Sequence, residues 1–355
     1  MNPAPDQMAG IGHWRLRTAV TIGRSEGDGP DAFGRVQDIA ADEHGQVFVL
    51  DFIAQQVRVF DSLGRHLRTF AGPGAGPGEI RYPLGIAYRN GKIWVNDPIA
   101  ARYSVYDADG TFLTSYRRRI PGYGFLWFGG VDSTERIYDW TFTVGPYSRE
   151  PGLHESHVES FALRIDPASG SIDSVPLPFQ GQRGYRARRG TSSIPFQGQF
   201  LWTIDAGGHV WVAFTDAYRI CQFGTGTDTL LLVEREYEPL PVTAAERAGA
   251  IASLQHWMDR SGGRVDLDYS VIPSVHPAIE YFDLDDAGNL WVRPVTTAET
   301  ASFDIFDTTG QLIATATADL KIRPYRSVRI SGNSAWFVVS DSLDVDYVVR
   351  AVIER

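Results

Sequence analysis

The feature that most constrains this chain is a strand–turn unit that returns at a spacing of about 45 residues. Its clearest copy lies between Gly45 and Gly91. Residues 47–51 (VFVLD) and 57–60 (VRVF) are rich in β-branched and aromatic residues, as strands are. The turn that follows, 61–64 (DSLG), has an acidic residue and a glycine. With the flanking segments 36–41 and 65–70, the unit predicts a four-stranded antiparallel meander.

Shorter matches mark the later copies of this unit. They are IWVND with SVYDADG, RIYD with RIDPASG, VWVAFTD with CQFGTGT, LWVR with DIFDTTG, and AWFVVSD. Each such sheet has two apolar faces and therefore needs neighbouring sheets to cover them. The pattern predicts an all-β, six-bladed β-propeller of four-stranded antiparallel blades. We expect a single domain, 1–355, with blades at approximately 36–70, 84–116, 125–177, 200–236, 279–316 and 325–354.

Two further segments complete the predicted architecture. The sixth unit contains only three strands, so we expect the extended N-terminal segment 13–22 to supply the fourth and close the ring. One inserted helix is predicted at about 243–260. Thr243 and Glu246 have the spacing of a capping box, and an apolar stripe follows at helical spacing. This helix would lie across the rim of the ring as a brace or as a lid.

Composition excludes several classes of protein. A net charge of −10 argues against a nucleic-acid-binding protein, because phosphate contacts need a basic surface. No apolar run approaches the roughly 20 residues that span a bilayer. The segment 1–12 lacks the basic start and apolar run of a signal peptide. Cys221 is the only cysteine, so no internal disulfide can form, and we interpret it as a strand residue rather than a nucleophile. A monomer is expected.

Basic residues gather in the segments that a propeller places on its top face, where the inner strands begin. They occupy 117–119 (RRR), a cluster in 183–189, and Lys321, Arg323 and Arg326. On an acidic protein such loops focus a positive potential, which favours an anionic ligand. The alternative is that these are solvated loops balanced by nearby carboxylates. The predicted ligand site lies on the top face at the central channel and comprises Tyr82, Trp127, Arg186, Arg188, Arg189, Tyr325 and Arg326.

Three histidines also fall in top-face segments. His154 and His157 lie in an insertion of the third unit, and His276 precedes the fifth. Neutral imidazoles bind zinc and other transition metals, so these residues are candidate metal ligands. The candidate cofactor is a divalent metal, zinc or calcium. A His-x-x-His spacing on a loop does not by itself direct both rings toward one ion. Ordinary loop histidines are the alternative interpretation.

The repeated pattern, hydrophobic-Val-x-Asp followed by Arg-x-x-hydrophobic-Phe-Asp-x-x-Gly, resembles NHL-type repeats. The whole chain resembles the bacterial six-bladed β-propeller proteins of that group. Many of these are exported, so the resemblance implies a periplasmic or extracellular protein if a leader was removed. Related propellers include amidating lyases and virginiamycin B lyase-like enzymes, which use channel histidines and metals. Gluconolactonase-like enzymes use an acidic and Asn metal set, and no motif here maps residue by residue onto any of these enzymes.

Two functions follow as hypotheses. The first is a binding module whose top face holds a small or peptide-like anionic ligand. The second is a metal-dependent lyase or hydrolase, in which His154, His157 and His276 hold an ion and a bound water acts as nucleophile or base. A third, a protein-interaction scaffold, would need a large exposed apolar patch.

Overall fold

The computed structural model describes residues 1–4, 9–120, 127–145, 150–156, 158–178, 182–224, 226, 228–261, 267–297, 300–320, 322 and 328–355. Within these residues the regular secondary structure is almost entirely β-strand, with one α-helix and one turn of 3₁₀ helix. None of the helices described is long and apolar enough to cross a membrane.

Four of the sheets are four-stranded antiparallel meanders, as the repeated unit predicts. The first two comprise β2 (Val36–Ala41), β3 (Val47–Asp51), β4 (Gln56–Phe60) and β5 (His66–Phe70), then β6 (Gly85–Arg89), β7 (Lys92–Asp97), β8 (Arg102–Asp107) and β9 (Phe112–Arg117). The next two comprise β10 (Gly130–Val131), β11 (Ile137–Val144), β13 (Val158–Ile165) and β14 (Ile172–Pro176), then β17 (Phe200–Ile204), β18 (Val210–Phe214), β19 (Arg219–Phe223) and β20 (Thr229–Glu234).

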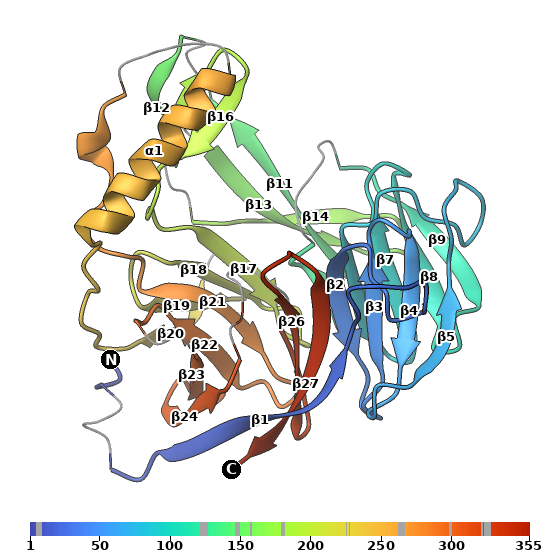
Figure 1. Ribbon diagram of the computed structural model, residues 1–355. Coiled ribbons are helices and arrows are strands. Elements are labelled where there is room, and N and C mark those ends of the chain that lie inside the picture. Colours follow the sequence, from blue (N-terminus) through green and yellow to red (C-terminus); the bar gives the residue numbers. More distant parts are fainter. Residues whose placement is uncertain are drawn as a thin grey trace.

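An eight-stranded sheet follows, in which the N-terminal strand lies between two units. Its order is β21 (Ile279–Leu284), β22 (Leu290–Pro294), β23 (Ala301–Phe306), β24 (Leu312–Ala318), β1 (Gly12–Ile22), β27 (Asp346–Glu354), β26 (Ser334–Ser340) and β25 (Val328–Ser331). β1 runs antiparallel to β27 and parallel to β24. Figure 1 shows β1 beside β27, so the two ends of the chain meet in one sheet.

Several turns within the meanders share one hydrogen-bonding pattern, in which an Asp carboxylate accepts backbone N–H groups of its own turn. In the turn between β4 and β5, the backbone N–H of Gly64 donates to the Asp61 carbonyl, while the Asp61 carboxylate accepts from the backbone of Leu63 and Arg65. Gly64 has a positive φ of 78°, which glycine adopts without strain. Asp42 caps the turn between β2 and β3 in the same way. The Asp-x-x-Gly spacing therefore sets these turns locally.

Asp51, at the end of β3, has an architectural role. Its carboxylate accepts backbone N–H groups from Gly34, Arg35, Ile53 and Ala54. Asp97 occupies the same place in the next sheet and accepts from the backbone of three residues, Arg81, Tyr82 and Ala100. Both carboxylates are fully buried, and they fix the loops that join neighbouring sheets.

The first strand of each unit lies innermost. β2 contacts β6, β6 contacts β10, β10 contacts β17, β17 contacts β21, β21 contacts β25, and β25 contacts β2. Apolar faces of successive sheets pack together: Phe48 and Val57 of the first lie in one core cluster with Ile86 and Ile93 of the second. Sheets stacked in this way around a shared axis are the arrangement of a β-propeller.

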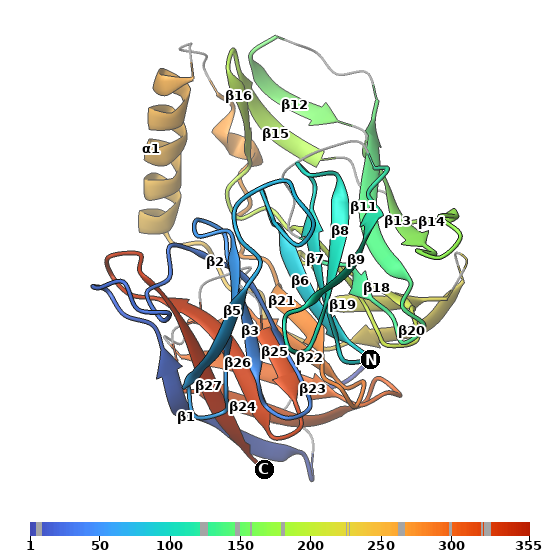
Figure 2. The same cartoon turned by 90° about the vertical axis from the view of Figure 1, so that its right-hand side faces the viewer.

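Three segments that leave the sheets on one side assemble into a separate layer, which we call the cap. It contains a three-stranded sheet of β12 (Gly152–Ser156), β15 (Gln182–Ala187) and β16 (Gly190–Ser193), together with α1 (Ala244–Arg260) and the 3₁₀ turn η2 (Tyr269–Val271). Figures 1 and 2 both place the cap at one end of the molecule. Two of these segments connect to the starts of the inner strands β17 and β21, so the cap lies on the predicted top side.

The helix α1 confirms the prediction for 243–260 almost to the residue. Thr243 is its N-cap, and the capping box with Glu246 is present. Leu254 and Met258 of its apolar stripe are buried in a cluster with Tyr185 and Ala187 of β15. The helix thus packs on the cap sheet, and the cap has a hydrophobic core of its own.

Candidate functional site

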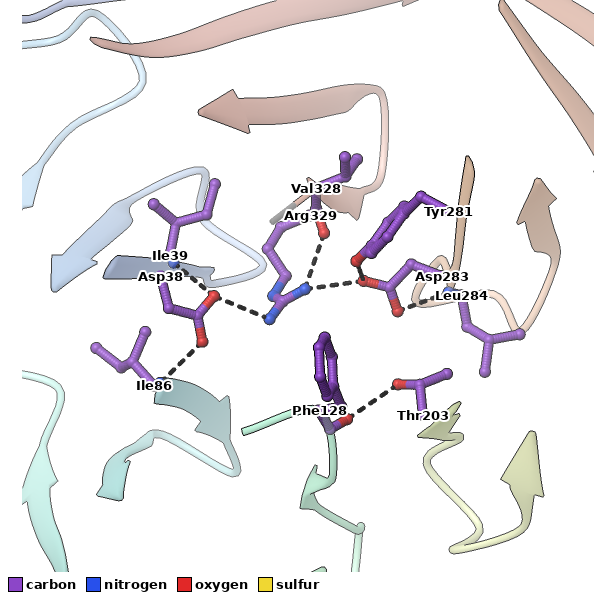
Figure 3. Close-up of polar contacts among 10 residues, drawn as sticks. All are labelled: Asp38, Ile39, Ile86, Phe128, Thr203, Tyr281, Asp283, Leu284, Val328 and Arg329. Atoms are coloured by element: carbon purple, nitrogen blue, oxygen red, sulfur yellow. Dashed lines mark hydrogen bonds and ion pairs between the residues drawn. The ribbon is translucent and has the colours of Figure 1, made fainter. Parts of the chain in front are cut away.

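The inner strands direct a group of charged side chains into the central channel. Asp38 comes from β2, Tyr281 and Asp283 from β21, and Arg329 from β25. Tyr281 and Asp283 are two residues apart on one strand and so share a face. Figure 3 shows Asp38, Arg329 and Asp283 pointing toward one another from three separate strands. We call these four residues the channel cluster.

Arg329 joins the two carboxylates of the channel cluster. Its Nη1 donates to Asp283 Oδ2 at 2.8 Å and to the Val328 carbonyl at 2.9 Å. Its Nη2 donates to Asp38 Oδ1 at 3.3 Å. Three of the five N–H donors of the guanidinium are used in these bonds, so the group retains donor capacity.

The carboxylates are held by backbone as well as by Arg329. Asp38 accepts from the backbone N–H of Ile39 at 2.8 Å and of Ile86 at 3.0 Å. Asp283 accepts from the backbone of Leu284 and from the Tyr281 hydroxyl, each at 2.9 Å. These contacts fix both carboxylates in orientation, and they join β2 to β6 at the channel wall.

The surroundings shift the ionisation of the cluster. Burial raises the pKa of Asp283, against the opposing effect of the Arg329 charge. Burial is the main cause that raises the pKa of Tyr281 well above its usual range, and the negative charge of Asp283 adds to it. Burial alone would lower the pKa of Arg329, but Asp38 and Asp283 outweigh it and raise that pKa. The guanidinium is therefore a permanent charge.

Two other Tyr–Asp–Arg groups show what such a cluster looks like when it is purely structural. Tyr103 donates to Asp139, which also pairs with Arg118 at 2.8 Å. Tyr218 donates to Asp304, which pairs with Arg235 at 2.8 Å. The arginine side chains of these two groups are 9% and 11% exposed, whereas that of Arg329 is 31% exposed. The channel cluster is thus the open member of a recurring arrangement.

Arg329 is exposed because it lines a cavity of about 470 Å³ in the channel. Ligand pockets typically measure about 300–1,000 Å³. Aromatic residues form much of its wall: Tyr88, Trp127, Phe128, Trp202 and Tyr281. In Figure 3 the ring of Phe128 points toward the channel cluster, and the Thr203 hydroxyl donates to the Phe128 carbonyl at 3.3 Å. The cavity therefore combines one charged end with apolar rings.

The cavity reaches the surface on the side opposite the cap. Its lining includes Glu43, Asn90 and Asp286, which are exposed and lie in turns after the inner strands. Six carboxylates and two guanidinium groups line it in all. Two of the carboxylates, Asp205 and Asp285, accept hydrogen bonds within their own turns. Among the described residues, the mouth is thus acidic rather than basic.

The predicted ligand site is divided between several places. Trp127 lines the cavity and donates its indole N–H to the Tyr138 carbonyl at 2.6 Å. Tyr82 is exposed and its ring contacts Phe52. Arg186 lies on β15, and Arg188 and Arg189 are exposed in the β15–β16 turn, so all three belong to the cap. Tyr325 and Arg326 lie outside the described residues.

The predicted metal ligands have other partners where they are described. His154, on β12, is within hydrogen-bond distance of the Glu150 carbonyl at 2.5 Å. His276 lies 3.3 Å from Glu246 and packs edge-on against Phe196. His157 lies outside the described residues. In the part of the chain that the structure describes, no group of three His, Cys, Asp or Glu residues has the arrangement of a metal site.

The sequence carries a signal for the channel cluster. Asp38 interrupts VQDIAA, Asp283 interrupts IEYFDL, and Arg329 interrupts VRIS. All three segments are predicted inner strands, and a charge inside such a strand is costly unless it is paired. Cys221 fits its interpretation: it lies half-buried on β19, and burial raises the pKa of its thiol.

Comparison with solved structures finds the same type of fold at low identity. The PQQ-bound aldose sugar dehydrogenase from Streptomyces coelicolor matches with a TM-score of 0.50 and 13% identity, over 96% of this chain and 98% of that one. A member of the DUF4221 family from Bacteroides vulgatus gives 0.49 and 8%, over 96% and 99%. The virginiamycin B lyase from Staphylococcus aureus gives 0.37 and 12%, over 88% and 83%. No family model matches the chain, and no curated protein is similar to it.

Proposed function

We propose that this protein is a six-bladed β-propeller of NHL type, with its ring completed by β1, that binds a small organic ligand in its central channel. The observation that carries the proposal is the contrast among the three Tyr–Asp–Arg groups. In two of them the arginine side chain is nearly buried, at 9% and 11% exposed, whereas the channel cluster opens onto a cavity of ligand size.

Burying a charge inside a protein costs free energy. A guanidinium paired with two carboxylates inside a protein is often no more stabilising than apolar residues of the same volume. If a charged cluster serves only to stabilise the fold, it is best enclosed by the protein, because exclusion of water strengthens the attraction between its paired charges. Because Arg329 is accessible from the cavity, its attraction to the two carboxylates is weaker than it would be in an enclosed cluster. A rigidly held hydrogen-bond donor beside an aromatic wall is instead what a binding site requires.

The ring and its location belong to the same proposal. The cyclic contacts of the six inner strands and the pairing of β1 with β27 support a closed six-bladed ring. Export to the periplasm or beyond follows from the resemblance to NHL-type bacterial propellers.

The test is to fill the cavity and ask whether ligand binding disappears. Thr203→Trp places an indole against Phe128, and Thr229→Trp makes the same change at an exposed position of β20. Saturation-transfer NMR with a mixed library of metabolites is expected to reveal ligands for the parent and for Thr229→Trp that Thr203→Trp no longer binds. The same set of ligands for all three proteins would show that the channel is not the binding site.

A further inference from the structure

We infer that the channel ligand is a neutral, polyhydroxylated molecule of mono- to disaccharide size. This inference rests on the proposed function and specifies the class of ligand that the cavity accepts.

The charges of the site argue against an anion. Arg329 is already flanked by two carboxylates, at 2.8 and 3.3 Å, so the channel cluster carries no net positive charge to offer. The mouth adds Glu43 and Asp286, both exposed. A ligand entering from this side first meets negative potential, which disfavours anions.

The same geometry argues against a cation at the inner end. Of the three charged side chains in the cluster, that of Arg329 is the most accessible, at 31%, whereas those of Asp38 and Asp283 are 7% and 15% exposed. A ligand ammonium would therefore meet the guanidinium before it reached either carboxylate. Contact between two cations is repulsive, and the two carboxylates that could offset it are already engaged by Arg329.

A hydroxylated ligand satisfies both requirements. Each hydroxyl can accept from an unused N–H of Arg329 and donate to a carboxylate oxygen, so it pairs with both kinds of group at once. Hydrogen bonds to charged groups are the stronger ones, and they need no net charge on the ligand.

The rest of the cavity fits the apolar face of a sugar ring. Phe128 lines it and points toward the channel cluster (Figure 3), and Trp127, Trp202 and Tyr88 also line it. Aromatic rings supply large apolar surface to the C–H face of a pyranose. A volume of about 470 Å³ equals that of about 16 waters, at roughly 30 Å³ each, which leaves room for one or two rings.

The experiment compares sugars that differ only in charge. Binding of D-glucose, D-galactose, maltose and cellobiose is measured by saturation-transfer NMR and calorimetry, beside the uronic acids and 2-amino derivatives of the two monosaccharides. We expect at least one neutral sugar to bind, and its acid and amine to bind about tenfold more weakly or worse. Tighter binding of the acid or the amine, or no binding of any neutral sugar, would overturn the inference.

Two matched arginine variants test whether sugar binding depends on the channel cluster. Arg329→Met is expected to weaken sugar binding by about tenfold to a hundredfold, because a hydrogen bond to a charged group is lost. Arg235→Met makes the same change in a closed Tyr–Asp–Arg group and should leave affinity within about twofold. Should Arg329→Met fail to fold, Phe128→Ala is expected to weaken binding through the aromatic wall. Unchanged affinity in Phe128→Ala would also count against the inference.

The two proposals can fail separately. If no sugar binds but other metabolites bind the parent and not Thr203→Trp, the ligand class is wrong and the channel remains the site. If Thr203→Trp changes the binding of no compound, the proposed function itself fails.

Discussion

Replacing Arg329 with Met tests whether the channel cluster is a coupled ionic unit. The substitution leaves Asp38 and Asp283 facing each other without the cation that lies 3.3 and 2.8 Å from them. Removing one partner of a buried ion pair costs about 3–5 kcal/mol. Since the cavity admits water to this cluster, we take the lower end, about 3 kcal/mol. At about 2.1 cal/mol/K of unfolding entropy per residue, this corresponds to a fall of about 4 °C in Tm.

The loss of stability in Arg329→Met should depend on pH in a defined direction. The pKa of Asp283 is already above its ordinary value of 3.8 in the folded protein, and removing Arg329 raises it further. A carboxyl with a raised folded pKa stabilises the fold when protonated, and this contribution is lost as pH rises through the folded value. The deficit of the variant should therefore be smaller near pH 4.5 than near pH 8.

Scanning calorimetry of the parent, Arg329→Met and Arg235→Met at these two pH values measures both effects. Arg235→Met should be destabilised more, because the Asp304 side chain it leaves is 5% exposed against 15% for Asp283. Adding Asp283→Asn to Arg329→Met should recover at least about 1 kcal/mol, since one of the two facing charges is then removed. A Tm change below about 1 °C, or an equal deficit at both pH values, would refute the reasoning.

Three further predictions follow from single features. Gly85→Ala should lower the free energy of unfolding, measured by thermal unfolding, by about 1–3 kcal/mol, because the new Cβ would lie 2.5 Å from the Cβ of Trp127. Gly249→Ala, on α1 with open space around it, should instead raise the free energy of unfolding by up to about 1 kcal/mol. If the cap binds anions, phosphate should raise the Tm of the parent, and this rise should vanish when three cap arginines are replaced with Ser: Arg186, Arg188 and Arg189. An unchanged rise in Tm would exclude an anion site in the cap. Elemental mass spectrometry should find the same metal content in the parent and in His276→Ala, because His276 pairs with Glu246; a stoichiometric metal lost in the variant would restore the metal-dependent enzyme hypothesis.

Most of the strands and turns could be predicted from the sequence because they are set by neighbours along the chain. Alternating β-branched and aromatic residues defined β3 and β4, and Asp61 closes the next turn with its own carboxylate. The capping box of Thr243 and Glu246 likewise marked the start of α1. Repetition of these local signals then indicated stacked sheets, since each has two faces to cover.

The site was decided by contacts between distant parts of the chain. Arg329 pairs with Asp38, 291 positions away, and with Asp283, 46 positions away. Strand alternation predicts which residues share a face, but it does not tell which inner strands lie opposite one another or how much space they leave between them. The cap arose in the same way, from three connections that share one hydrophobic core. Thus the sequence alone determined the repeating unit, whereas the tertiary structure decided which paired charges are closed and which open onto the channel, because burial depends on packing among all the sheets.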